Sequence, residues 1–191
     1  MPDPVTYSMV SVPKGSNNQG QPDSKKNIVI IFDFDKVTAY TRDAKGVTIT
    51  ALTLASPATP IGLFVNERTI DAGDEMEGDD YERGWLHHFN FHHPGSDLAF
   101  AEFKANNANA NLGAISISCD PAVTTAKVYG TPCAPLKMQK ADLVDNNEAN
   151  RQEVELKSSA RTFPAGIIAK SLIPVTDNAD INTFLGLTAG V

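Results

Sequence analysis

Two aspartates, Asp33 and Asp35, follow the apolar run Ile28 to Phe32 with one residue between them. A buried strand that ends in Asp-x-Asp is typical of phosphatases in which one carboxylate is the nucleophile and the other the general acid. Such enzymes need a parallel sheet, and therefore a helix between successive strands. Here a turn (residues 42–46) and another strand-like stretch come next, so we expect both aspartates to lie on one strand, flanking Phe34, without a catalytic role.

All four histidines fall within seven residues, as His87, His88, His92 and His93. Neighbouring side chains of a strand point to opposite faces, and His88 and His92 would share one face about 13–14 Å apart. Metal ligands lie only about 2 Å from the metal. We therefore expect no metal site, and histidines that are exposed or at the edge of the core.

Residues 71–82 form the most acidic stretch of the chain and contain no basic residue. Carboxylate oxygens suit calcium, but the spacing differs from that of an EF-hand loop. The stretch is too charged to enter a core and too long for a tight turn. It therefore predicts a solvated loop, or one that docks on a basic partner. The acids are Asp71, Asp74, Glu75, Glu77, Asp79, Asp80 and Glu82.

The composition of the 191 residues excludes several classes of protein. A net charge of −7 argues against a protein that grips nucleic-acid phosphates. The two cysteines, Cys119 and Cys133, are not in a Cys-x-x-Cys pair, so we expect two reduced thiols. The first residues do not resemble a signal peptide, and no apolar run approaches the roughly 20 residues of a membrane span. We expect no catalytic residues, cofactor or metal.

Short alternating stretches separated by turns predict a mainly β fold, an antiparallel β-sandwich or barrel with one central α-helix. That helix is expected after Ser96 as N-cap, and a weaker one over 178–186. Residues 1–26 are rich in Pro, Gly, Ser, Asn and Gln and predict an extended arm. The folded domain is expected over 27–170, followed by an extension, 171–191. Strands are expected at 28–34, 46–55, 61–70, 84–93, 113–119, 126–130, 135–145, 151–159 and 166–174.

Several stretches together resemble the major tail tube proteins of tailed bacteriophages, and the related tubes of contractile injection systems. These stretches are "NIVIIFDFDKVTAYTRDAKGVTIT", "FNFHHPG", "FKANNANANLGAISISCD" and "GTPCAPLKMQKADLVDNNEAN". They look most like tail tube proteins of phages and prophages of the Bacteroidetes group. The resemblance covers roughly residues 5–170 and rests on turn and strand patterns. The acidic stretch and the extension depart from it.

The resemblance implies a structural subunit without enzymatic activity, assembled in the host bacterial cytoplasm and located in the virion tail. Its partners would be copies of itself in stacked, commonly hexameric rings, other tail proteins, and DNA that passes without specific binding; no membrane is implied. We expect the arm to become ordered in the assembly, and the seven acids, with Lys25 and Lys26, to lie at contacts between rings. The alternative is a monomeric β-sandwich binding module whose acidic loop binds a cation or ligand.

Overall fold

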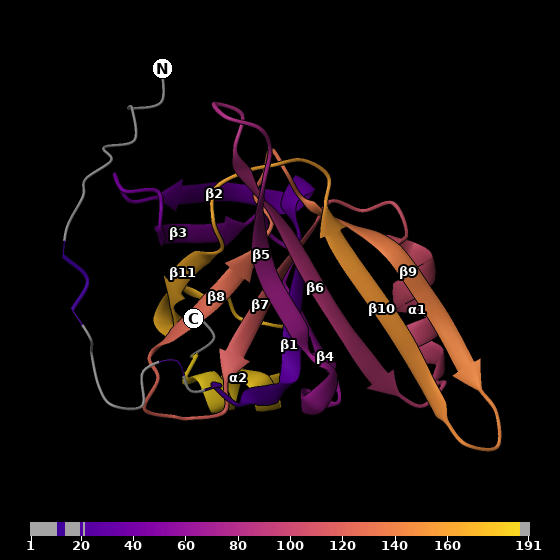
Figure 1. Cartoon of the computed structure of the whole chain (residues 1–191). Helices are drawn as coiled ribbons and strands as arrows, with labels where there is room; N and C mark the ends of the chain where they lie inside the picture. The colour runs from indigo at the N-terminus through magenta and orange to yellow at the C-terminus, as the bar shows by residue number, and fades with distance from the viewer. Residues whose placement is uncertain (1–10, 14–19, 21, 188–191) are drawn as a thin grey trace.

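A computed structural model describes residues 11–13, 20 and 22–187, and the strands join into one sheet that folds over itself (Figure 1). The strands are β1 (Lys25–Asp33), β2 (Val37–Arg42), β3 (Thr48–Leu54), β4 (Ile61–Phe64), β5 (Asp71–Glu77), β6 (Gly84–Pro94), β7 (Leu112–Ser118), β8 (Thr125–Tyr129), β9 (Leu136–Asp145), β10 (Asn150–Ser158) and β11 (Gly166–Ala169). The helices are α1 (Leu98–Asn107) and α2 (Ala179–Leu185), with 3₁₀ turns η1 (Phe34–Lys36), η2 (Glu67–Thr69) and η3 (Lys170–Leu172). Neither described helix has the length and apolar composition needed to cross a membrane.

The sheet has two layers that meet at one corner. One layer runs in the order β4-β1-β7-β8-β11-β3-β2, and the other in the order β9-β10-β6-β5. The pairing of Leu112 with Leu136 joins β7 to β9 and so connects the layers. The expected mainly β, sandwich-like fold is confirmed. The expectation of a purely antiparallel sheet is wrong, because β11 pairs with β3 in parallel, and the sheet does not close into a barrel.

Alternation along the central strand β1 separates two apolar cores. Val29 and Ile31 face the first core, between the layers, where they meet Phe89 and Phe91 of β6. Helix α1 covers the end of this core with two further phenylalanines, Phe100 and Phe103. The four strands β9, β10, β6 and β5 are therefore held against the molecule through one face only.

The second core lies on the opposite face of β1 and involves the C-terminal segment. Ile30 and Phe32 of β1 pack there, and α2 contributes Ile181 and Leu185. Asn178 caps the N-terminus of α2, and Gly186 ends it in the left-handed conformation with φ 67°. The weak helix expected over 178–186 is confirmed, and residues up to Leu187 pack on the domain.

All nine expected strands are present, and two strands, β2 and β5, were not expected. β5 has the sequence DAGDEME, whose residues have low β propensity, and it forms because it pairs along its whole length with β6. The helix α1 begins one residue later than expected. Its N-cap is Asp97 rather than Ser96, since Asp97 Oδ1 accepts the backbone N–H of Phe100 at 2.7 Å.

Removing the cap of α1 should destabilise the protein measurably. We expect Asp97→Ala to lower the free energy of unfolding by about 1 kcal/mol, in the 0.5–2 kcal/mol range of N-cap deletions. Ser96→Ala is the control, because Ser96 Oγ only accepts from Asn150 Nδ2 at 3.3 Å, and it should cost under about 0.5 kcal/mol. Urea unfolding of both variants measures the difference, and equal losses would contradict this assignment of the cap.

Candidate functional site

The acidic stretch is a strand and a turn, so the expectation of a long loop is wrong for its first half. Residues 71–77 form β5, the last strand of its layer, and residues 78–83 connect it to β6. Alternation then sorts the acids by direction. Asp71, Glu75 and Glu77 lie on the outer face of the layer, away from the core, whereas Asp79, Asp80 and Glu82 lie in the exposed turn.

Asp74 differs from the other acids because it points inward. It lies opposite the buried His87, and its Oδ2 accepts the backbone N–H of Ala165 at 2.8 Å. Asp74 thus connects the segment before β11 to the hairpin formed by β5 and β6. Its expected role in contacts between copies is not supported by this position, and Asp74→Ala would remove an internal hydrogen bond.

The two candidate lysines lie in β1 rather than in an arm, and they are distant from the acidic turn. Lys25 pairs with Asp23 at 3.3 Å, and Lys26 Nζ lies 4.4 Å from the centre of the Phe184 ring in α2. In Figure 1 the turn between β5 and β6 is at the top and α2 at the bottom. Within one chain the lysines and the turn cannot meet, so any contact between them requires two chains. Most of the expected arm lies outside the described residues.

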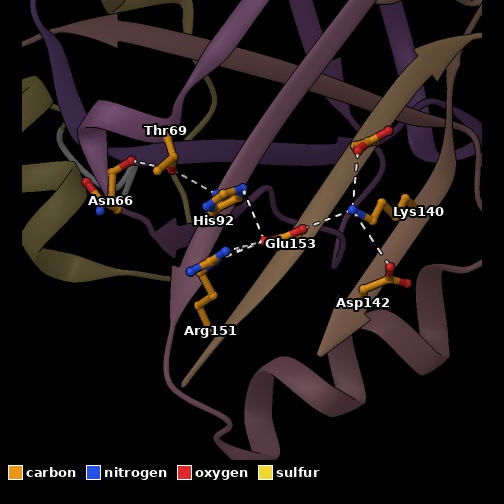
Figure 2. A network of polar contacts seen from close by, with 8 residues as sticks. Asn66, Thr69, His92, Lys140, Asp142, Arg151 and Glu153 are labelled. Atoms are coloured by element: carbon orange, nitrogen blue, oxygen red, sulfur yellow. Dashed lines mark hydrogen bonds and ion pairs between the residues drawn. The ribbon is translucent and has the colours of Figure 1, made fainter. Parts of the chain in front are cut away.

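The outer face of β9, β10 and β6 carries a network of charged side chains centred on Glu153 (Figure 2). Lys140 Nζ donates to Glu153 Oε2 at 2.9 Å, and Arg151 Nη2 lies 2.8 Å from Oε1. His92 Nε2 approaches the same carboxylate at 4.0 Å. Hydrogen bonds from Lys140 and then Arg151 lower the pKa of Glu153 from its ordinary value of 4.5 to about 2. The hydrogen bond with Glu153 in turn raises the pKa of Lys140.

The depressed pKa makes Glu153 a source of acid sensitivity. Its stabilisation is fully present above about pH 4.5 and is lost as the pH falls toward 2, because the unfolded chain binds the proton first. We therefore expect Glu153→Gln to be less stable than wild type at pH 7 and to approach it at pH 3. The control is Glu148→Gln in the exposed turn before β10. Urea unfolding at both pH values tests this, and a difference independent of pH would contradict it.

The histidines alternate as expected, but one of them is fully buried. His88 and His92 lie on the outer face, whereas His87 and His93 point to the core with Phe89 and Phe91. His87 Nδ1 accepts the N–H of Gly130 at 2.7 Å, so Nε2 carries the proton and donates to the Phe163 carbonyl at 2.9 Å. Burial lowers the pKa of His87, which keeps it neutral. The expectation that histidines are exposed or at the edge of the core is wrong for His87. The signal was present, because His87 lies two and four residues before Phe89 and Phe91 and therefore on the same, inward face of β6.

His93 joins three elements at the other end of β6. Its Nδ1 lies 2.8 Å from the Phe64 carbonyl of β4, and its Nε2 lies 2.9 Å from Asp97 Oδ2. Its ring stacks on Phe100 with the centroids 4.2 Å apart. Asp97 has a lowered pKa because it accepts from the Phe100 N–H and from His93. This arrangement fixes α1 on the sheet and leaves neither ring nitrogen for a ligand.

Asp33 and Asp35 do not share a strand, so that expectation is wrong, and both make local hydrogen bonds. Asp33 ends β1 and caps η1 by accepting the Asp35 N–H at 2.9 Å, while Asp35 Oδ1 accepts from Asn111 Nδ2 at 2.8 Å. Both neighbours of β1, β4 and β7, run antiparallel to it. The parallel surroundings of an aspartate-nucleophile phosphatase are therefore missing at this position.

Other candidate groups are spread over the surface. Cys119 and Cys133 are exposed and unpaired. No three His, Cys, Asp or Glu side chains in the described part of the chain are placed to hold a metal ion. A groove of about 740 Å³ lies beside the hairpin turn, with Trp85, Phe163 and Arg161 among its lining residues. Sequence patterns gave no signal for this groove, because the turn, the β2–β3 connection and the segment before β11 form it together.

No protein-family model matches this sequence, and comparisons with curated proteins and with solved structures found no match.

Proposed function

We propose that the chain is a structural subunit that associates with copies of itself, edge to edge, into rings that build a tube of the phage-tail type. The observation that carries this proposal is the layer formed by β9, β10, β6 and β5. Among the described residues, β5 pairs only with β6, and β9 beyond Leu136 pairs only with β10. Both edges of one layer therefore lack a second partner strand, which leaves room for pairing with another chain, although Lys104 of α1 donates to the Ala141 carbonyl of β9.

The edge of β5 is acidic, whereas β9 carries Lys137 and Lys140 together with Asp142 and Asp145, so pairing of two β5 edges is disfavoured relative to pairing of β5 with β9. On β5 the exposed acids are Asp71, Glu75 and Glu77. Near the edge of β9 lie Lys137 and Lys104, whose Nζ atoms donate to the carbonyls of Asn109 and Ala141. Two copies of β5 would repel each other, while β5 of one copy would attract β9 of the next. Head-to-tail contacts of this kind form a ring if the rotation closes.

The outer face of the layer suits the lining of a channel. It carries charged and polar side chains on all four strands, among them Glu153, Glu155, His88 and Asp71, instead of the apolar side chains that a second sheet would require. Two of its cations, Lys140 and Arg151, are engaged by carboxylates, whereas Lys157 has no ion pair among the described residues. With the net charge of −7 per chain, such a lining would allow DNA to pass without gripping its phosphates.

Negative-stain microscopy and analytical ultracentrifugation of the purified full chain test the proposal. Rings and tubes are the expected result. A single species at the monomer mass of 20.5 kDa at all concentrations would overturn it. That outcome would favour the alternative of a monomeric binding module whose acidic turn, beside the groove at Trp85, binds a cation or ligand. In the tube, the protein would be part of a virion tail. The absence of catalytic activity stays a prediction.

A further inference from the structure

The turn between β5 and β6 presents one fully exposed aromatic side chain on a backbone that another segment holds in place. Tyr81 is fully exposed and has φ 71°, a left-handed conformation that is uncommon for a non-glycine residue. Arg161 Nη1 donates to the Glu82 carbonyl at 2.8 Å and lies against Gly78, where a Cβ would collide with it. The turn is thus held from outside by the segment before β11. Less backbone entropy therefore remains to be lost when a partner binds the turn.

The charges around Tyr81 are largely uncompensated within the chain. Asp79, Asp80 and Glu82 surround it, and Asp80 pairs with Arg83 at 2.8 Å. The described residues provide no ion pair for Asp79 or Glu82. A central aromatic side chain with a polar rim is the usual composition of an energetically dominant contact between proteins.

The opposite end of the molecule has a groove of complementary character. It has a volume of about 490 Å³, and Phe184, Val123 and Pro121 are among its lining residues. Two cations lie over its aromatic ring, since Lys26 Nζ is 4.4 Å and Lys170 Nζ 5.8 Å from the centroid of Phe184. Neither lysine takes part in an ion pair with the described residues. The groove therefore offers an apolar wall beside two uncompensated positive charges.

We propose that the groove between η3 and the end of α2 binds the β5–β6 turn of a second copy, with Tyr81 against Phe184 and the turn acids against Lys26 and Lys170. The groove and the turn lie at opposite ends of the molecule, so the contact repeats without closing on itself and extends along an axis (Figure 1). This inference rests on the proposed function, in which it is the contact that stacks one ring on the next. It differs from the β5–β9 contact, which acts within a ring.

Photo-crosslinking of the full chain tests the contact directly. The photoreactive residue p-benzoylphenylalanine replaces Tyr81, and a ¹⁵N-labelled copy is mixed with an unlabelled one to identify crosslinks between chains. We expect the crosslinks to map to the peptide 170–187. The same residue at position 143, an exposed apolar site on β9, is the control and should not crosslink there. Crosslinks from position 81 to other regions, or none at all, would overturn the inference.

Substitutions separate this inference from the proposed function. Tyr81→Ala, or Lys26→Glu with Lys170→Glu, should weaken stacking by roughly tenfold or more while single rings persist. The Lys26→Glu/Lys170→Glu variant should associate with an Asp79→Lys/Glu82→Lys variant when the two are mixed, because the charges of groove and turn are then exchanged. Lys36→Glu with Lys157→Glu is the charge-matched control, because both lysines are exposed and lie outside the turn and the groove. Unchanged stacking in the Tyr81 variant would overturn this inference and leave the ring proposal standing. Crosslinks from position 81 to residues 170–187 in a protein that forms no rings would overturn the ring proposal and leave this inference standing.

Discussion

Chains that carry both Glu75→Lys and Glu77→Lys are expected to form no rings and to sediment as monomers. The reason is that both substitutions place cations on the β5 edge, which would then meet Lys137 and Lys104 near the β9 edge of the next copy. Like charges brought together at an interface cost several kcal/mol, so self-association should weaken by roughly a hundredfold or more. Analytical ultracentrifugation across a concentration series measures this loss.

The fold of the doubly substituted chain should remain intact, because both side chains are exposed. The free energy of unfolding should change by no more than about 0.5 kcal/mol per site. Glu67→Lys with Glu148→Lys changes the net charge equally at exposed positions outside both edges and should leave the rings intact. Adding Lys104→Glu and Lys137→Glu to the β5 variant should restore association. Rings of normal size from the β5 variant itself would show that this edge takes no part in assembly.

Truncation of Phe89 is expected to cause the largest loss of stability. Phe89 is fully buried between the two layers, with its ring centroid 5.3 Å from that of Tyr129 and 6.1 Å from that of Phe91. Phe89→Ala should lower the free energy of unfolding by about 3–5 kcal/mol, since the layers cannot close the cavity. In a domain of this size the melting temperature should fall by roughly 10 °C.

Phe64→Ala is the matched control, because Phe64 is 54% exposed and should cost under about 1 kcal/mol. Urea unfolding and calorimetry of both variants give the comparison. Equal losses for the two variants would show that the layers are not packed through β6. Since Phe89 holds the layer that carries both free edges, assembly of the Phe89 variant should also fall as the temperature approaches its lowered melting point.

Much of the fold follows from local patterns in the sequence. Period-two alternation identified β6, in which His87, Phe89 and Phe91 point inward, because an apolar face fixes a strand independently of its partners. The helix expected over 178–186 is present as α2, and its cap residue, Asn178, and terminal glycine, Gly186, are local signals that act over a single turn. The mainly β class and the split of the histidines between two faces depend on the same local rules.

The remaining features depend on contacts between residues far apart in the sequence. β5 has an acidic sequence with little strand preference and becomes a strand because β6 offers a hydrogen-bonding edge along seven residues. Asp74 resembles its acidic neighbours in sequence, yet the Ala165 N–H, 91 positions away, gives it an internal role. The sequence alone determined nine of the eleven strands of the described residues and which segments carry charge. Only the tertiary structure decided which edges stay unpaired and that Tyr81 and Phe184 lie at opposite ends, because both are set by how the two layers fold onto each other.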